Sequence, residues 1–360
     1  MNKSANSRRP AFLGLLILIL VIAGAFLFST FQQNNQPPKT VKGFVGGEKI
    51  NFLENEEVKK ILREKYRLKI DINKAGSLDM IRASHENVDF LFPSNQTALE
   101  LYLNTIGPTY KDDIIFNTPI VLYSHKLVAD ALVQSGLAES VDGVYQVKMQ
   151  ALVDKMAADA TWADVNLPQL FGPLTVDTTD PAKSNSGNMF SGLVANMLNG
   201  GQVVTEKNTA AILPDLLHIF SKLGYMETSS SDLFNQFLKT GVGAKPLVAG
   251  YENQLLEFSK LNPEAWQKVK DDIVILYPQP TVWSTHILIA LDAAGEELMI
   301  ALKDDRIQQI AWDQHGFRTG VYTAKAAAET FDVPGVSADI TQIIQMPNQK
   351  AMEQIISAFQ

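Results

Sequence analysis

The chain of 360 residues contains no cysteine. This absence excludes disulfides, thiolate catalysis, cysteine-ligated metals and lipid attachment to a cysteine. The sequence also lacks H-x-x-x-H and H-E-x-x-H spacing, so its scattered histidines predict no zinc site. A G-x-S-x-G nucleophile elbow is missing too, which argues against a serine hydrolase. We therefore expect a protein that is not an enzyme and that carries no metal and no cofactor. The five histidines are His85, His125, His218, His286 and His315.

A complete phosphate-binding loop is also missing. Residues 43–49 approach the pattern, but Lys49 stands one position late and no Ser or Thr follows it to bind magnesium. A nucleotide site is therefore not predicted. An exposed Lys beside an acidic residue is usually solvated, so we expect Lys49 to face water. His286 lies in an apolar strand and is expected to be structural.

Acidic residues are absent from the N-terminal region, where none precedes Glu48. Three basic residues, Lys3, Arg8 and Arg9, come before an apolar run at 11–28. This order predicts a signal peptide or a signal anchor with its N-terminus in the cytoplasm. The run is long enough to span a bilayer, which favours an uncleaved transmembrane helix. Residues 1–40 then form a cytoplasmic tip, the anchor and a polar tether, and the folded domain is extracytoplasmic at the cell membrane.

The remainder of the chain is acidic. Removing those three basic residues leaves 28 Lys and Arg against the 39 Asp and Glu, a net charge of −11 for residues 31–360. That sign opposes binding to nucleic acid and to anionic membrane surfaces. The overall composition, 46% hydrophobic and 19% charged, is that of an ordinary globular protein. The length predicts about two domains or lobes.

Strands and helices alternate through the first third of the chain. Predicted strands at 41–44, 68–72, 88–92 and 120–123 each end in a short polar loop and lead into a helix. Such alternation predicts a mostly parallel sheet with helices on both faces. Small ligands bind where the carboxyl ends of parallel strands meet. Three loops offer a small or hydroxyl residue there: Gly47, Ser77 and Ser94.

The stretch at 174–199 is the most informative. Leu174 and Val176 alternate with polar residues as in a short strand, a polar turn follows, and an apolar helical face runs to Asn199. The turn therefore lies over a helix N-terminus, whose free N–H groups and partial positive charge suit an anion. The alternative is ordinary helix capping by Ser184 or Ser186.

The second half of the chain is mainly helical, with a return near 273–291. Helices are predicted near 149–158, 213–223, 233–238 and 253–261, and a strand at 246–250. Consecutive strands at 273–277 and 282–291 predict a crossing between two lobes. A long helix at 296–312 and a final one at 346–359 complete the chain.

In this order the pieces resemble the bacterial extracellular solute-binding proteins of the type II periplasmic fold, near the molybdate, phosphate and sulfate branch. The resemblance covers about 41–320, and its most telling part is the loop Asp-Pro-x-x-Ser-x-Ser-Gly at 180–187. The other motifs are Gly46-Gly-Glu48, Lys74-Ala-Gly-Ser77, Pro93-Ser-Asn-Gln96 and Tyr251-Glu-Asn253.

The resemblance implies two α/β lobes that close on a ligand, each a mostly parallel sheet with flanking helices, preceded by one transmembrane helix. Lobe 1 would hold 41–118 and 284–360, and lobe 2 would hold 119–283. The implied function is a membrane-anchored binding protein for a small polar, anionic solute, serving an ABC-type importer or a sensor. Its partners would be the solute and a transporter permease or another membrane or surface protein. The residues expected to bind the ligand are Gly47, Glu48, Ser77, Ser94, Asn95, Ser124, Ser184, Asn185 and Tyr251.

Two departures from the family keep an alternative open. The chain lacks a lipobox cysteine, and it has Gly47-Glu48 where anion binders often show paired Ser or Thr. An extracytoplasmic interaction or assembly module with the same fold and no transport role therefore remains the second hypothesis.

Overall fold

The structure is a computed structural model that describes residues 37–320 and 330–360, together with Leu18 and Val21. The predicted membrane anchor at 11–28 falls outside these residues apart from those two positions. Among the described residues, no helix combines the length and apolarity needed to cross a membrane.

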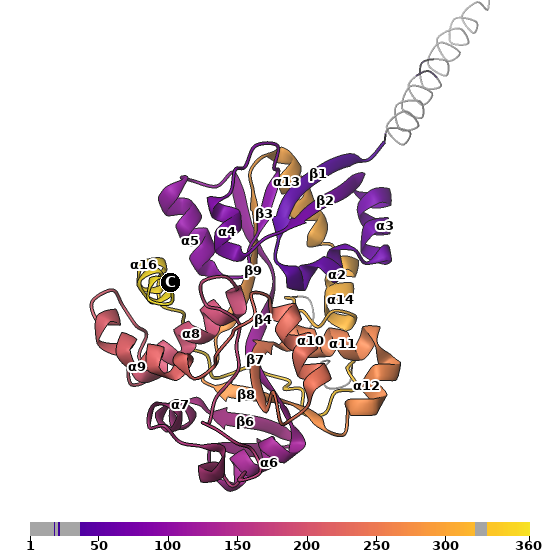
Figure 1. The fold of residues 1–360 in the computed structure, drawn as a ribbon. Coiled ribbons are helices and arrows are strands. Elements are labelled where there is room, and N and C mark those ends of the chain that lie inside the picture. Colours follow the sequence, from indigo (N-terminus) through magenta and orange to yellow (C-terminus); the bar gives the residue numbers. More distant parts are fainter. Residues whose placement is uncertain (1–17, 19–20, 22–36, 321–329) are drawn as a thin grey trace, which may run out of the picture.

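In the described part of the chain, nine strands form one sheet in the order β2-β1-β3-β9-β4-β8-β6-β5, with β7 paired to β4 (Figure 1). The strands are β1 (Lys39–Val45), β2 (Leu68–Lys74), β3 (Phe90–Phe92), β4 (Lys111–His125), β5 (Ala138–Val141), β6 (Val144–Lys148), β7 (Leu247–Tyr251), β8 (Ile273–Gln279) and β9 (Trp283–Ala290).

The sheet is mixed rather than mostly parallel, which corrects the prediction. Pairs β1–β2, β1–β3 and β6–β8 are parallel, but β3–β9, β4–β7, β4–β8, β4–β9 and β5–β6 are antiparallel. All four predicted strand–helix units are present, since β4 is followed directly by α6, but only the first three strands run parallel to one another. The strand β4 runs antiparallel to β7, β8 and β9, so the order of units along the sequence did not fix its direction.

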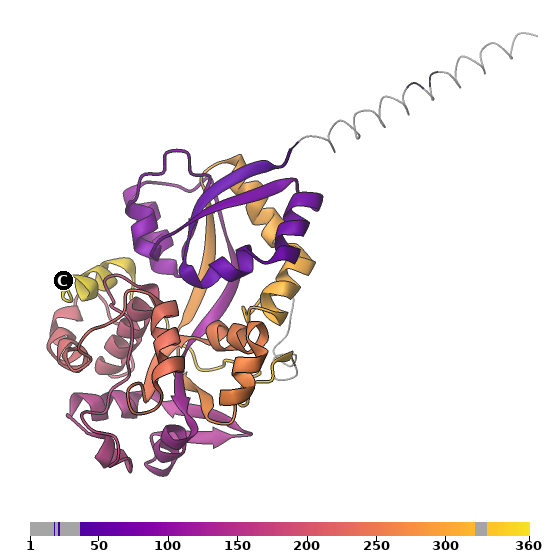
Figure 2. The same cartoon turned by 45° about the vertical axis from the view of Figure 1, so that its right-hand side comes forward.

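The long strand β4 joins the two halves of the molecule. Its residues 111–119 pair with β9, while residues 120–125 pair with β7 and β8. The chain crosses back between β8 and β9, as the two consecutive strands at 273–291 predicted. Figures 1 and 2 show β4 and β9 running between an upper and a lower half.

Helices cover the sheet in both halves. In the upper half they are α2 (Ile50–Leu53), α3 (Glu56–Lys65), α4 (Ser77–Arg82), α5 (Gln96–Thr105), α13 (Ala293–Leu302) and α14 (Asp305–Asp313), with the short 3-10 helix η1 (Gly47–Lys49). In the lower half they are α6 (Lys126–Gln134), α7 (Met149–Ala157), α8 (Asn185–Leu198), α9 (Thr209–Ser221), α10 (Ser230–Thr240), α11 (Glu252–Leu261) and α12 (Pro263–Val269), with the 3-10 helix η2 (Trp162–Val165). The last helix is α16 (Gln349–Ser357).

Side-chain caps explain several helix starts. The side chains of Asn55, Asn95, Asp292, Asp304 and Asn348 each accept a hydrogen bond from a first-turn N–H of the helix that follows. The cap at Asp304 divides the single helix predicted at 296–312 into α13 and α14. The adjacent carboxylates of Asp304 and Asp305 therefore lie at the start of α14.

The predicted strand at 174–176 is wrong. Leu174 and Val176 are buried, but the segment makes only isolated bridges, of Pro173 with Thr161 and of Asp177 with Val248. The alternation of buried and exposed residues therefore reflects an extended segment lying on a core, without a ladder of hydrogen bonds. The helix that follows, α8, is present as predicted.

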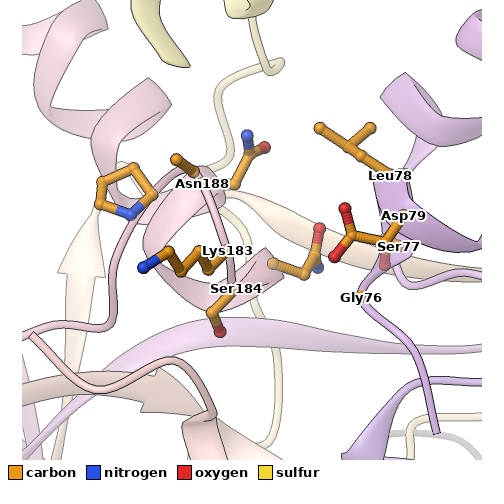
Figure 3. Close-up of a pocket in the computed structure, with 10 residues that line it drawn as sticks. Gly76, Ser77, Leu78, Asp79, Lys183, Ser184 and Asn188 are labelled. Carbon is orange, nitrogen blue, oxygen red and sulfur yellow. The ribbon is translucent and has the colours of Figure 1, made fainter. Parts of the chain in front are cut away.

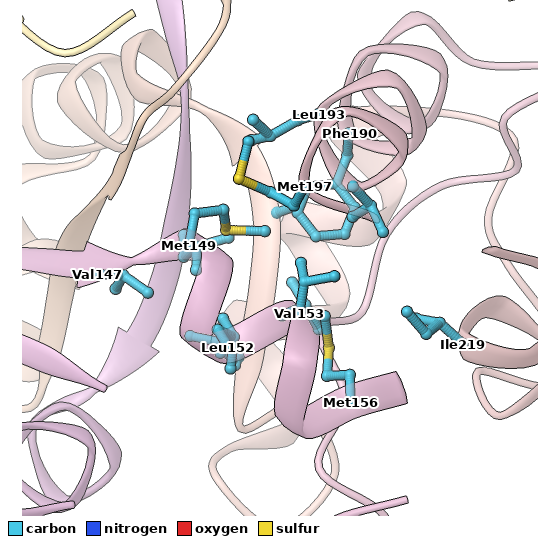
Figure 4. Close-up of a cluster of buried hydrophobic side chains, with 14 of the residues drawn as sticks. Val147, Met149, Leu152, Val153, Met156, Phe190, Leu193, Met197 and Ile219 are labelled. Atoms are coloured by element: carbon cyan, nitrogen blue, oxygen red, sulfur yellow. The ribbon is translucent and has the colours of Figure 1, made fainter. Parts of the chain in front are cut away.

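The largest apolar cluster lies in the lower half, where α7, α8 and α9 pack together (Figure 4). Met149, Met156, Leu193 and Met197 all belong to it and are buried. Because these side chains have apolar neighbours on several sides, they fix the position of α8 and of the loop before it. The N-terminus of α8 is therefore held on a rigid support.

The C-terminal segment packs on the lower half. Phe331, Val333 and Val336 join the apolar cluster of Trp266 and Ile275, while Met352, Ile355 and Ile356 join that of α8 and α9. In α16, Gln349 also contacts the upper half, where its side chain accepts a bond from Asn104 (3.0 Å) and its N–H donates to Glu100 (2.9 Å). The predicted lobe boundaries did not include this packing of residues 331–356 on 119–283.

Candidate functional site

A cavity of about 500 Å³ lies between the two halves of the molecule. The upper wall comprises the loops after β1 and β2, and the lower wall comprises the loop before α8, the segment before α10, and the end of β7. The residues that line it are Gly46, Gly47, Glu48, Lys74, Ala75, Gly76, Ser77, Asp79, Lys183, Ser184, Asn185, Thr228, Ser229, Ser230 and Tyr251.

A smaller cavity of about 10 Å³ opens beside it. The two cavities share six lining residues: Gly76, Ser77, Asp79, Lys183, Ser184 and Asn185. Figure 3 shows Gly76, Ser77, Leu78 and Asp79 on one side of this cavity and Lys183, Ser184 and Asn188 on the other. The starts of α4 and α8 thus face each other. This small space has room for a water molecule or one atom of a ligand.

Six of the nine residues predicted to bind a ligand line the large cavity: Gly47, Glu48, Ser77, Ser184, Asn185 and Tyr251. They come from sequence positions more than two hundred residues apart, and the fold brings them together.

Ser94 and Asn95 lie just behind the cavity wall. Ser94 is buried, and its hydroxyl donates to Glu48. Asn95 caps α5 with its side-chain oxygen and donates from its amide to Asn185. Both residues therefore support lining residues, and neither lines the large cavity itself.

Ser124 lies away from the cavity. It sits near the end of β4 with its side chain fully buried, and its hydroxyl donates to the carbonyl of Pro246 at 2.6 Å. The sequence placed it at a strand end, but β4 runs antiparallel to β7 and β8, so this end points away from the loops that form the cavity. Ser124 therefore makes a hydrogen bond in the protein interior that holds β4 to the segment before β7.

Asn185 joins the two walls. Its amide nitrogen donates to the carbonyl of Ser94 in the upper half (3.2 Å) and to the hydroxyl of Tyr251 in the lower half (2.8 Å). Its oxygen accepts from Asn95. This first residue of α8 therefore connects both halves at the base of the cavity.

Ser184 occupies the N-cap position of α8, yet its side chain accepts no bond from a first-turn N–H. Its hydroxyl lies 3.3 Å from that of Ser186, which is buried and bonds to Thr179 at 2.8 Å. Ordinary capping by either serine is therefore not what the structure shows. The hydroxyl of Ser184 is left facing the cavity.

Lys49 is buried, contrary to the prediction that it faces water. Its side chain is 0% exposed and its ammonium donates to three acceptors: Glu48 Oε1, Ser94 Oγ at 2.6 Å, and His286 Nδ1 at 3.2 Å. The three N–H groups of a lysine match these three acceptors. Sequence reasoning missed this burial, because an isolated lysine beside an acidic residue is usually solvated.

The charges in this cluster stabilise one another. Burial alone would raise the pKa of Glu48, but the charge of Lys49 and the hydrogen bonds from Lys49 and Ser94 lower it to about 2. Burial lowers the pKa of Lys49, and Glu48 opposes that effect. Burial and the neighbouring Lys49 lower the pKa of His286 well below its usual value, so His286 is neutral and its Nδ1 accepts from Lys49. His286 is structural, as predicted, and it is also part of this charge network.

The neighbourhood of the cluster is aromatic. The ring of His286 lies 5.0 Å from that of Phe116 and 5.2 Å from that of Phe317, and Lys49 Nζ lies 5.0 Å from the ring centre of Phe92. These rings exclude water from one side of the cluster and strengthen the interaction between Lys49 and Glu48.

A second buried ion pair lies near the crossing strands. Arg318 donates from Nε and Nη2 to the two carboxylate oxygens of Glu252 (2.6 and 2.7 Å), and Tyr277 donates to the same carboxylate at 2.6 Å. Arg318 also donates to the carbonyls of Ser337 and Ala338. It therefore ties the start of α11 to the C-terminal segment and to β8.

Across residues 37–320 and 330–360, no three His, Cys, Asp or Glu side chains are grouped as metal ligands would be.

Solved structures with this arrangement are known. A periplasmic thiamin-binding protein superimposes with a TM-score of 0.60 at 12% identity, covering 89% of this chain and 95% of its own. The protein AfuA of Actinobacillus pleuropneumoniae, bound to fructose-6-phosphate, gives 0.56 at 13% identity, with 89% and 97% covered. The sulfate-binding protein SubI of Mycobacterium tuberculosis gives 0.50 at 14% identity, with 85% and 93% covered.

The chain has the type II periplasmic solute-binding fold. This fold confirms the resemblance inferred from the order of the sequence motifs. No protein-family model matches the chain, and no curated protein matches its sequence. At these low identities the likeness establishes the fold, and the ligand has to be argued from the residues of this chain.

Proposed function

We propose that the protein is an extracytoplasmic solute-binding protein that holds a small polar solute with an anionic group in the cavity between its two halves. The observation that carries the proposal is the convergence of six predicted residues on one 500 Å³ cavity at the helix start of α8. A cavity of that size suits a small solute. The fold it shares with proteins named for binding thiamin, sulfate and fructose-6-phosphate supports the same role.

Closure would occur about the two connections between the halves, β4 and the β8–β9 return. Hinge closure of this kind occurs when a ligand contacts both walls. In this proposal lobe 1 contains 41–118 and 284–320, lobe 2 contains 119–283, and the C-terminal segment moves with lobe 2, on which residues 331–356 pack. Lys74 and Ser229, which approach within 3.2 Å across the cavity, would part on opening.

The apolar run at 11–28 would hold the protein in the cell membrane, next to an ABC-type permease or a sensor that receives the solute. A single helix of this apolarity would be enough for permanent anchoring.

An assembly module with the same fold is the second candidate. The observation in its favour is Asn185, whose hydrogen bonds join both walls directly. A module whose two halves never separate would use such a link.

A thermal-shift screen of the full chain in mild detergent separates the two candidates. Oxyanions, amino acids and sugars are added singly, and a true ligand at 100 times its Kd should stabilise the fold by about 2.7 kcal/mol. A rise in melting temperature with one chemical class supports the binding protein. If none of the three classes raises it, the binding function is refuted and the assembly module is favoured.

A further inference from the structure

Charges of both signs surround the large cavity. The carboxylates of Glu48 and Asp79 line it together with the ammonium groups of Lys74 and Lys183. A site built for a simple oxyanion would not place two carboxylates around the bound charge, because like charges repel strongly in a partly desolvated cavity. The distribution of these charges therefore bears on the class of ligand.

The ion pair of Glu48 and Lys49 presents its negative end to the cavity. Lys49 is fully buried and donates to Glu48, Ser94 and His286, so none of its three donors is left for a ligand. Oxygen Oε1 of Glu48 accepts from Lys49 and Ser94, whereas Oε2 has no hydrogen bond to any residue that the structure describes. Glu48 thus keeps one carboxylate oxygen for a donor in the cavity.

The opposite wall offers donors and no negative charge of its own. The helix α8 is 14 residues long, and the N–H groups of Asn185, Ser186 and Gly187 have no acceptor among the described residues. Asn188, in the same first turn, is 2% exposed and its amide oxygen and nitrogen both lack a partner in the described part of the chain. This side chain lines the small cavity beside Ser184 (Figure 3).

An unpartnered buried amide at a helix start is costly unless a ligand or water satisfies it. Together with the partial positive charge of the helix and the neighbouring Lys183, it makes this wall suitable for an anionic group. The lower wall therefore favours an anionic group, whereas the upper wall carries the carboxylates of Glu48 and Asp79 beside the ammonium group of Lys74.

We propose that the solute is a zwitterion, whose ammonium group binds Glu48 and whose acidic group binds the N-terminus of α8 beside Ser184 and Asn188. This inference rests on the proposed binding function and names its ligand class. Amino acids and amine-bearing phosphate esters share this chemistry. The ammonium donates to the free oxygen of Glu48, and the acidic oxygens accept from the first-turn N–H groups and from the Asn188 amide.

The test compares matched probes on the full chain in mild detergent by titration calorimetry. The zwitterions are the L-α-amino acids and phosphoethanolamine, which distinguish a carboxylate from a phosphate as the acidic group. Each zwitterion that binds is compared with its analogue lacking the amine, an α-hydroxy acid or ethyl phosphate. Sulfate, inorganic phosphate and molybdate are tested alongside.

Loss of the amine should weaken binding by about 10- to 150-fold, as expected for a hydrogen bond to a charged group. The double substitution Glu48→Gln with Lys49→Met removes both buried charges together, and it should abolish the difference between each zwitterion and its analogue. Glu297→Gln is the matched control, since this carboxylate is exposed on α13 and pairs with Lys39 at the surface. It should leave both affinities unchanged.

Equal binding of an amine-free analogue or of a simple oxyanion would overturn the zwitterion and leave the binding function standing. A panel in which no probe binds would overturn both. The comparison of matched probes on the unsubstituted chain needs no variant, so the inference stays testable even if the double substitution unfolds the protein.

Discussion

The buried pair of Glu48 and Lys49 makes a quantitative prediction about stability. Glu48→Gln keeps an amide oxygen that can accept from Lys49, but it removes the negative charge, so the fully buried ammonium of Lys49 loses its counter-charge. Lys49→Met leaves the carboxylate without its main partner. Breaking a buried ion pair from one side costs about 3–5 kcal/mol, because the remaining charge is unpaired in a medium of low polarity.

The double substitution should cost much less than either single one. The double substitution removes both charges and keeps side chains of similar volume, so no unpaired charge stays buried. The free energy of unfolding should therefore fall by less than about 1 kcal/mol. For a chain of this length, at about 2 °C per kcal/mol, each single variant should melt about 6–10 °C lower and the double variant within about 2 °C of the unsubstituted chain.

The assay is a double-mutant cycle read by thermal unfolding, with Glu297→Gln as the exposed control. That control should change stability by less than about 1 kcal/mol, as exposed ion pairs do. Additive effects, with the double variant as unstable as the sum of the two singles, would refute the argument. The residues would then act independently and would not form a buried pair.

Three further predictions concern other parts of the molecule. The pKa of His286 is lowered in the folded state, so the unfolded chain binds more protons than the folded chain below about pH 6.5. The free energy of unfolding should therefore fall by up to about 1.4 kcal/mol per pH unit as the pH drops. In melting curves recorded from pH 7.5 to 5, the His286→Gln variant should show a smaller fall. Ser184→Ala should change the stability of the ligand-free protein by less than about 0.5 kcal/mol, because no capping bond is lost, but it should weaken solute binding by about 0.5–3 kcal/mol. A lower melting temperature with unchanged affinity in calorimetry would show that Ser184 does not belong to the site. Arg318→Met leaves the carboxylate of Glu252 buried and should cost about 3–5 kcal/mol in urea unfolding, whereas a loss below 1 kcal/mol would show that the pair is not a structural link.

Local sequence patterns predicted helices and strands well where apolar periodicity, or a polar loop after a strand, was enough to define them. The helix α8 and the strands β1, β2 and β8 follow from apolar periodicity, and the starts of α4 and α5 follow from a strand ending in a polar loop. The convergence of residues 47, 77 and 184 on one cavity followed from the order of these units. These features depend on short-range physics that a single sequence carries.

The features that sequence reasoning missed depend on tertiary context. Lys49 looks like a surface residue until the fold provides three acceptors, and Ser124 looks like a site residue until β4 proves antiparallel to its neighbours. Asn188 could not be singled out, because its importance lies in the partners that its amide lacks. Burial and strand direction are set by contacts between distant segments, which periodicity does not report.

The central claim, that a solute binds between the two halves and draws them together, can be tested by one distance measurement. Because the chain has no cysteine, Lys60→Cys in α3 and Lys239→Cys in α10 place two spin labels on exposed positions, one in each half. We predict that a zwitterionic solute at saturating concentration shortens and narrows the distance distribution between the labels. An unchanged distribution in the presence of a bound solute would contradict closure around a ligand, and with it the proposed function.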